Sequence, residues 1–368
     1  MKIAYLGQMA DVSCETSIAK KIRDQLLAWS SAGHACRYFA LAPSETVWSD
    51  LARVAPCTLL ARGPVWQRPL RSRQLCHTLT AWQPDLIYFR YAYHAPGLPS
   101  LFGRFPAVAE INSDDTREYA LTLSPAKQLY HRLTRSRVLR PIAGFVTVTH
   151  ELTRVLDGFS PARITIGNSI SLASFFSLPE KNIPADPRLL FIGTAGSPWH
   201  GLERLAELAA IFPAWRFDVV GLTAQDWHRQ TGHDSISTNL QLHGPLPAHG
   251  YAALLPQIDI AVGSLALFKN GMHEACPLKV REYLAHGLPV IGACADTDIP
   301  EDADYYLRLP NDSAPLAPHR EAIAAFVKHW QCRRVHRASV AHLDTSVKES
   351  ARLAFMAKIA ADFRSSSP

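Results

Sequence analysis

Short apolar runs alternate along the first half of the chain with longer segments in which apolar residues recur every three to four positions. Residues 2–6 form an apolar run, whereas residues 17–31 place Ile22, Leu26 and Trp29 on one helical face. A short apolar run indicates a buried strand, and apolar residues at helical spacing indicate an amphipathic helix. Further strands are predicted at residues 35–41, 85–89, 107–111 and 145–149. This alternation predicts a parallel sheet covered by helices.

The same alternation restarts after residues 177–187, which mix prolines with charged residues and show no periodicity. This stretch is the predicted linker. Beyond it, strands are predicted at residues 188–193, 216–221, 239–243, 258–264 and 288–293, and helices at residues 201–212, 247–255, 277–286 and 346–363.

The pattern predicts an α/β protein with two Rossmann-like domains. We expect the N-terminal domain at residues 1–176, the linker at residues 177–187, the C-terminal domain at residues 188–345 and a final helix at residues 346–368. Ligands of open α/β sheets bind beyond the carboxyl ends of the strands. Two such sheets facing each other therefore predict one site in an interdomain cleft.

Composition narrows the class of protein. The 368 residues are 48% hydrophobic and 19% charged, which excludes a disordered or fibrous chain. A net charge of +6 allows binding to phosphates or to an anionic membrane but is not the dense basic stripe of a nucleic-acid-binding protein. The seven cysteines include no CxxC pair, and no apolar run is long enough to span a membrane. We therefore expect a cytoplasmic protein without disulfides or structural zinc.

Common cofactor motifs are missing from the sequence. The first strand is not followed by GxGxxG, so the chain lacks the fingerprint of a dinucleotide-dependent oxidoreductase. Neither a GxxxxGK[ST] loop nor an HExxH motif occurs anywhere. Asp296 and Asp298 form a DxD pattern, but no further ligand cluster accompanies it, and we assign no metal to it.

The segment at residues 271–291 carries the strongest chemical signal. Pro277 suits the first turn of a helix and Gly287 the position just after its end. The amides of Leu278 and Val280 then lie at a helix N-terminus, which is a ready anion site, and Lys279 adds a positive charge beside it. This arrangement predicts a phosphate-binding site.

Two glutamates bracket this predicted phosphate site. Glu274 lies in the loop before the helix, and Glu282 lies about one and a half turns inside it. Carboxylates are good acceptors for the paired hydroxyls of sugars. A sugar, a diphosphate and a ribose in series match this order, so the segment predicts a nucleotide-sugar site.

Glu274 and Glu282 also form an E-x7-E pattern, and the segment resembles the donor-binding signature of the retaining glycosyltransferases of family four, which have the GT-B fold. Similar segments stand in the family's order at residues 164–170, 191–194 with 199–202, 217–221, 242–246 and 259–262. The resemblance covers nearly all of the second half of the chain, whereas the first half matches mainly in layout.

The resemblance implies a metal-independent transferase without a cofactor, whose donor is a UDP- or GDP-linked sugar. It places the ribose on Glu282 and the base near Gly244 and Leu246, and it gives Glu274 a catalytic role. The other implied contacts are Lys279, Leu278, Val280, Gly7, Gly196 and His200 for the diphosphate and Glu274, Ala275 and Cys276 for the donor sugar.

Three positions depart from the family pattern. His200 replaces the usual lysine, Thr194 replaces the usual arginine, and Thr16-Ser17 replaces a glycine pair. Two alternatives therefore stay open. One is a sugar-nucleotide epimerase of the same fold, and the other is a catalytically silent partner that binds nucleotide-sugar for an active transferase.

Polar residues follow two strand ends in the first domain. Arg90 and His94 follow one strand, and Glu110 and Asn112 follow the next. Because such positions face a ligand site, we expect His94 and Glu110 to act in catalysis and Arg90 and Asn112 to contact the acceptor. Ordinary loop turns and caps are the alternative.

Two basic segments of the first domain also contain exposed-looking apolar residues. Residues 127–140 carry a lysine and four arginines among leucines and a tyrosine, and Arg62, Arg68, Arg71 and Arg73 lie near Trp66. This pattern suits an anionic membrane surface, although a solvated helix flank has the same pattern. We expect a glycan, lipid-linked or small-molecule acceptor and peripheral contact with the inner membrane face through Lys127–Arg140.

Overall fold

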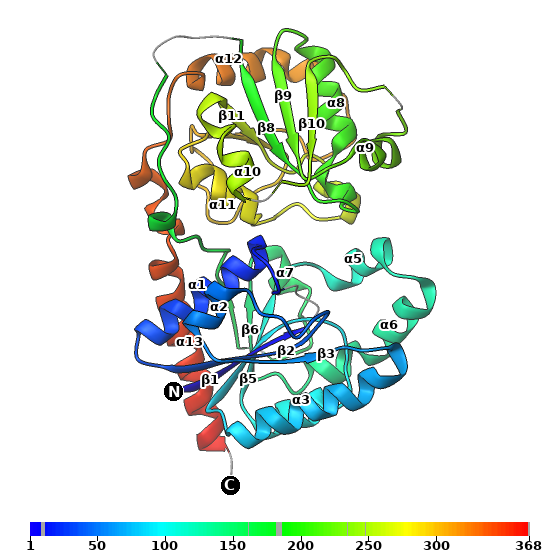
Figure 1. Cartoon of the computed structure of the whole chain (residues 1–368), viewed down its shortest axis with the longest axis vertical. Coiled ribbons are helices and arrows are strands. Elements are labelled where there is room, and N and C mark those ends of the chain that lie inside the picture. Colours follow the sequence, from blue (N-terminus) through cyan, green and yellow to red (C-terminus); the bar gives the residue numbers. More distant parts are fainter. Residues whose placement is uncertain (9–11, 161, 182–185, 234, 247, 367–368) are drawn as a thin grey trace. The chain divides into compact units, whose positions relative to one another are not determined.

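The computed structural model describes all residues except 9–11, 161, 182–185, 234, 247 and 367–368. It divides into two compact units, one formed by residues 1–169 with 345–368 and the other by residues 170–344 (Figure 1). The unit boundary at Ser169 precedes the predicted linker at residues 177–187. None of the helices in the described residues is long and apolar enough to cross a membrane.

Unit 1 is built on a parallel sheet whose described strands follow the order β3-β2-β1-β4-β5-β6-β7. The strands are β1 (Lys2–Gln8), β2 (Ala35–Ala42), β3 (Cys57–Ala61), β4 (Leu86–Arg90), β5 (Ala107–Ile111), β6 (Gly144–Thr147) and β7 (Arg163–Thr165). Its helices are α1 (Ser17–Ser31), α2 (Ser49–Val54), α3 (Arg68–Trp82), α4 (Leu98–Arg104), α5 (Asp115–Thr122), α6 (Pro125–Leu139), α7 (His150–Arg154) and α13 (Thr345–Ser366).

Unit 2 repeats this arrangement, with the described strands in the order β10-β9-β8-β11-β12-β13. They are β8 (Arg188–Ile192), β9 (Arg216–Val220), β10 (Leu240–Gly244), β11 (Ile260–Val262), β12 (Val290–Gly292) and β13 (Tyr306–Arg308). The helices are α8 (Leu202–Ile211), α9 (Ala224–Thr231), α10 (Ala248–Ala252), α11 (Leu278–Ala285) and α12 (Arg320–Trp330), and a 3₁₀ turn, η3 (Pro198–His200), follows β8.

These strand orders confirm the predicted α/β class with two Rossmann-like sheets. Each sheet reverses its strand order at one place, between β1 and β4 in unit 1 and between β8 and β11 in unit 2. Ligands of such sheets bind at this switch point, beyond the carboxyl ends of the strands. The topology therefore marks one edge of each unit as a candidate site.

Helix α1 shows how local sequence and packing agree in unit 1. The Thr16 hydroxyl caps the helix by accepting the Ala19 amide hydrogen at 3.0 Å. Trp29 of α1 stacks on Tyr5 of β1, with ring centroids 5.7 Å apart, and contacts Tyr88 of β4 edge-on. The helix spans the residues predicted for it, Ser17–Ser31.

The chain returns to unit 1 at its C-terminal end. Met356 and Ile359 of α13 are buried in the same core cluster as Tyr5 and Trp29, and α13 lies beside α1 (Figure 1). This confirms that the final helix packs on the N-terminal domain. The helix begins at Thr345, one residue before its predicted start.

Candidate functional site

Helix α11 forms the centre of the predicted site in unit 2. It begins directly after Pro277, and Gly287 follows it with a positive φ of 83°, as the sequence predicted. The Val280 amide already donates to the Pro277 carbonyl at 3.1 Å. The amides of Leu278 and Lys279 precede this first intrahelical bond, whereas the Val280 amide is already used in it, and the phosphate contacts stay predictions.

Lys279 and His200 lie together at the carboxyl end of β8, at the switch point of the sheet. Lys279 Nζ donates to the Ile192 carbonyl at 3.1 Å and lies 4.4 Å from the centre of the Phe191 ring. Burial lowers the pKa of Lys279 to about 7. A phosphate beside this lysine would favour its charged form, so the position suits the predicted anion site.

His200 is held as a neutral donor beside this lysine. Burial and the charge of Lys279 hold the pKa of His200 well below its usual value. Its Nδ1 accepts the Thr194 amide hydrogen at 3.2 Å, so the ring hydrogen lies on Nε2. Gly196, exposed and with a positive φ of 75°, belongs to the same loop. The geometry suits the predicted neutral hydrogen bond from His200.

The two glutamates occupy different surroundings. Glu282 is buried in α11, where its Oε2 accepts the Tyr251 hydroxyl hydrogen at 3.0 Å. Glu274 is half-buried before the helix, and its loop is fixed by the Ala275 amide, which donates to the Ala295 carbonyl at 2.9 Å. Sequence reasoning missed Tyr251, and nothing in the local pattern distinguishes it from other tyrosines.

The predicted base-binding positions follow β10. Gly244 ends this strand with a positive φ of 69°, and its carbonyl accepts the Gly221 amide hydrogen at 2.8 Å. A positive φ favours glycine and turns the chain sharply away from the sheet. Leu246 is half-buried two residues later. These positions therefore lie at the carboxyl edge of the unit 2 sheet.

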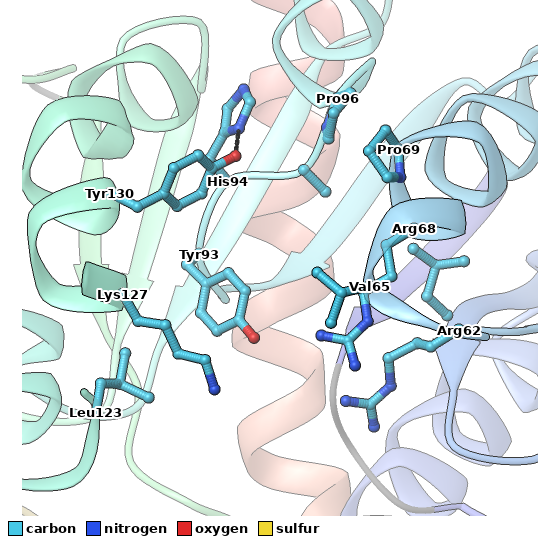
Figure 2. Close-up of a pocket in the computed structure, with 12 residues that line it drawn as sticks. Arg62, Val65, Arg68, Pro69, Tyr93, His94, Pro96, Leu123, Lys127 and Tyr130 are labelled. Carbon is cyan, nitrogen blue, oxygen red and sulfur yellow. Dashed lines mark hydrogen bonds between the residues drawn. The ribbon is translucent and has the colours of Figure 1, made fainter. Parts of the chain in front are cut away.

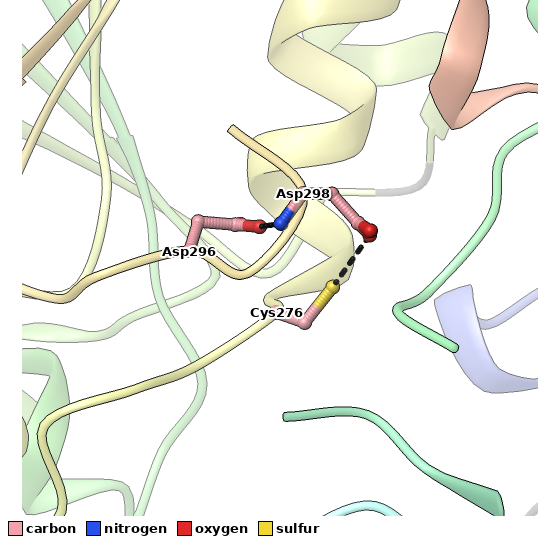
Figure 3. A group of neighbouring side chains, drawn as sticks. All are labelled: Cys276, Asp296 and Asp298. Atoms are coloured by element: carbon pink, nitrogen blue, oxygen red, sulfur yellow. Dashed lines mark hydrogen bonds between the residues drawn. The ribbon is translucent and has the colours of Figure 1, made fainter. Parts of the chain in front are cut away.

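The DxD pattern of unit 2 is organised around an arginine. Cys276, Asp296 and Asp298 gather their ligand atoms within 4.8 Å of one another (Figure 3). The buried Arg281 guanidinium donates to Asp296 at 2.7 and 2.8 Å and to Asp298 at 3.0 Å, and it also contacts Cys276. A guanidinium thus supplies the positive charge that a cation would bring. The Cys276 side chain belongs to this cluster, so a contact to a sugar falls to its backbone.

Gly7 lies at the end of β1, at the switch point of unit 1. A Cβ at this position would lie 2.3 Å from the hydroxyl oxygen of Tyr38, which is buried in the neighbouring strand β2. Packing alone therefore requires glycine here. Its predicted contact with a phosphate stays a prediction.

Glu110 lies inside a buried charge network and not on an open surface. Its Oε1 lies 2.9 Å from Lys21 Nζ and 3.6 Å from Arg352 Nη2, and its Oε2 accepts from Arg90 at 3.2 Å and from Asn112 at 3.3 Å. Burial alone raises its pKa, but these cations together lower it far below its usual value. A fully buried carboxylate that is paired with these cations suits a structural role, and its predicted catalytic role stays a prediction.

The other predicted residues of unit 1 divide between this network and a pocket. Asn112 uses both ends of its amide in the network, since its Oδ1 also accepts from Lys21 at 3.0 Å. His94 instead contacts Tyr130, with Nδ1 2.7 Å from the hydroxyl oxygen, and it lines a pocket. Arg90 bonds Glu110 but keeps 15% of its side chain exposed, so it remains a surface candidate.

Comparisons with known proteins identify the fold of the chain. Neither a protein-family model nor a curated protein matches the sequence. Among solved structures, sucrose-phosphate synthase from Thermosynechococcus elongatus is similar at 15% identity with a TM-score of 0.64, covering 99% of this chain and 98% of that one. HepE of Anabaena in complex with UDP and glucose is similar at 16% identity and 0.61, covering 100% of both chains. The chain has the GT-B fold.

A third GT-B structure, the lipopolysaccharide outer core galactosyltransferase WaaB, is similar at 11% identity with a TM-score of 0.64 and covers 97% of this chain and 99% of its own. The predicted GT-B fold is thereby confirmed. Membership of the retaining family four and the assigned site residues stay predictions.

Proposed function

We propose that this protein is a glycosyltransferase that moves a sugar from a nucleotide-diphosphate sugar to a hydroxyl acceptor. One observation carries the proposal: Lys279, His200 and the N-terminus of α11 gather at the switch point of unit 2, with Glu274 before the helix and Glu282 within it. The structures of HepE, determined with UDP and with UDP-glucose, support a UDP-linked donor.

The proposed donor site assigns one part of the ligand to each group. Glu282 accepts hydrogen bonds from the ribose hydroxyls, and the base lies near Gly244 and Leu246. The diphosphate is held by the charge of Lys279, the Nε2 hydrogen of His200 and the first amides of α11. Glu274 and the backbone of residues 275–276 hold the sugar hydroxyls.

The proposed reaction retains the configuration of the sugar and uses no metal. The bond between the anomeric carbon and the diphosphate oxygen breaks, and the acceptor oxygen bonds to that carbon from the same face. The acceptor's proton passes to the departing phosphate oxygen. The protein stabilises the negative charge that grows on the diphosphate, which is the electrostatic work that Lys279 and the helix amides suit.

Calorimetric titration with UDP and GDP tests the donor site. We expect Glu282→Ala to weaken binding of the preferred nucleotide roughly tenfold or more, since a charged hydrogen bond is worth about 1.5–3 kcal/mol. Glu301→Ala, which removes an exposed carboxylate of the same unit, should leave affinity unchanged.

Tyr251→Phe separates ribose binding from packing, because it removes the Tyr251 contact but keeps the Glu282 carboxylate. Unchanged nucleotide affinity in a folded Glu282→Ala variant, or an equal loss in Tyr251→Phe, would overturn the ribose assignment. Product analysis with and without acceptor then separates the transferase from the epimerase, and absence of turnover with tight nucleotide binding identifies a silent partner.

A further inference from the structure

Unit 1 contains a pocket of about 290 Å³ at the carboxyl ends of its strands. Leu41 is the last residue but one of β2, Arg62 follows β3, and Tyr93 follows β4, so the pocket lies at the edge of the sheet where ligands bind. Figure 2 shows Tyr93 between one wall that carries Arg62 and another that carries Lys127. The lining residues of this pocket all belong to unit 1, whereas Lys279, His200, Glu274 and Glu282 belong to unit 2.

The pocket carries positive charge that no carboxylate of the described residues neutralises. Arg62, Arg68 and Lys127 line it, and none forms an ion pair within the part of the chain that the structure describes. Arg62 Nε is buried without a hydrogen-bond partner there. Residues 62–84 and 119–150 contain no aspartate or glutamate at all. A buried unpaired donor is costly, which indicates an anionic ligand.

The remaining walls of the pocket are largely apolar. They are formed by Leu41, Val65, Pro69, Ala95, Pro96 and Leu123. A small hydrophilic anion would leave this surface in contact with water, and a neutral apolar ligand would leave Arg62 unpaired. The chemistry therefore fits a molecule with an anionic group next to an apolar chain.

Exposed apolar side chains flank the pocket on both sides. Val65, Trp66 and Leu70 are 71%, 77% and 69% exposed; the first two precede α3 and Leu70 lies in its first turn. On the facing segment, Leu129 and Leu133 of α6 are 55% and 67% exposed. Exposed apolar side chains that gather beside a pocket are typical of an interaction site. The neighbouring cations are Arg71, Arg73, Arg132 and Arg137.

We propose that residues 62–73 and 121–137 dock unit 1 on an anionic membrane, and that the pocket between them takes an anionic amphiphile of that membrane as the acceptor. Apolar side chains enter the interface while basic residues meet anionic headgroups. The acceptor role rests on the proposed glycosyltransferase function. The membrane docking does not, because it involves only unit 1.

Co-sedimentation of the full chain with vesicles tests the docking. One set of vesicles contains phosphatidylcholine alone, and the other contains phosphatidylcholine mixed with phosphatidylglycerol. We expect binding only to the second set. Arg62→Gln with Arg68→Gln should weaken it roughly 30-fold, at about fivefold for each basic residue at an anionic surface. Arg320→Gln with Lys328→Gln, which removes two exposed charges of unit 2, is the matched control.

Several results would overturn the docking. These are equal binding to both vesicle sets, an equal loss in the control pair, or binding of a single-stranded RNA more tightly than vesicles. Trp66→Ser with Leu70→Ser should also reduce vesicle binding, and unchanged binding in that pair contradicts insertion of the apolar rim.

Short-chain phosphatidic acid and inorganic phosphate test the pocket itself by calorimetry. We expect the amphiphile to bind more tightly than phosphate and to lose affinity in the Arg62→Gln, Arg68→Gln variant. Equal affinity for phosphatidic acid and for inorganic phosphate would contradict the proposal that the pocket binds an apolar chain. UDP affinity reports separately on unit 2: normal UDP binding without vesicle binding refutes the docking alone, and vesicle binding without UDP binding refutes the proposed donor site alone.

Discussion

Lys279 shows how one residue can tie burial to ligand binding. Its ammonium group lies over an aromatic ring and against one carbonyl, so burial favours the neutral amine and lowers its pKa to about 7. A diphosphate beside it would favour the charged form again. Donor binding should therefore be coupled to uptake of a proton by this side chain.

The coupling predicts a pH dependence. Below pH about 7 Lys279 is already protonated and donor affinity should be constant, whereas above it affinity should fall by up to about tenfold per pH unit. The measurement is calorimetry with a UDP-sugar, because the terminal phosphate of UDP itself titrates at about pH 6. Lys279→Met should bind weakly with no such slope, and a slope that persists in this variant would contradict the assignment.

Glu274 predicts a different signature from Glu282. The free nucleoside diphosphate lacks the sugar, so Glu274→Gln should leave its affinity unchanged. The donor loses a charged hydrogen bond that strengthens as positive charge develops on the sugar ring, so turnover should fall roughly tenfold or more. Calorimetry and initial rates on the same variant check this. If Glu274→Gln instead abolished affinity for the nucleoside diphosphate and preserved turnover, the roles assigned to Glu274 and Glu282 would have to be exchanged.

At the scale of elements, α11 and the segment after β12 are joined by a buried ion cluster. Arg281 of α11 is fully buried and pairs with Asp296 and Asp298, which follow β12. Removing one partner of a buried pair leaves a charge without compensation. We expect Arg281→Met to lower the free energy of unfolding by about 3–5 kcal/mol, measured by urea denaturation.

Lys328→Met on the exposed face of α12 is the control, with an expected change within about 0.5 kcal/mol.

The cluster of Arg281, Asp296 and Asp298 also predicts how activity depends on metal ions. With Arg281 supplying the positive charge, chelators should leave turnover intact. Loss of activity in EDTA that manganese restores would instead make Asp296 and Asp298 metal ligands.

At the scale of the whole molecule, the last helix completes the core of the first unit. Arg352 of α13 is buried and pairs with Glu349, which accepts the Trp29 indole hydrogen at 2.9 Å, and it lies 3.6 Å from Glu110. The last helix therefore adds Arg352 and Glu349 to a charge network whose other members, Lys21, Arg90 and Glu110, lie in the N-terminal segment.

Arg352→Met should loosen unit 1 and leave unit 2 unchanged. Hydrogen–deuterium exchange should speed up in peptides of α1, β5 and α13, because the buried Glu110 loses a counter-charge. Peptides of unit 2 and UDP affinity should not change. Lys358→Met, an exposed substitution on the same helix, is the control, and uniform acceleration over both units would contradict the assignment.

The sequence determined what local chemistry can encode. The spacing of apolar residues predicted the observed bounds of α1, and Pro277 and Gly287 predicted where α11 begins and ends. These signals depend on residues a few positions apart, so they can be recognised in the sequence before the fold is known. The three strands β3, β7 and β13 were not predicted, since two of them have only three residues and show no period.

Only the tertiary structure decided which distant residues meet. A glutamate near a strand end can be an exposed acid or a buried ion. Glu110 is a buried ion because Lys21, Arg90 and Arg352, which lie far apart in the sequence, pack around it. The tertiary structure likewise pairs Arg281 with the carboxylates of the DxD pattern. It also brings residues 62–69 and residues 123–130 together around one pocket. Such contacts depend on strand order and packing, which no local pattern specifies.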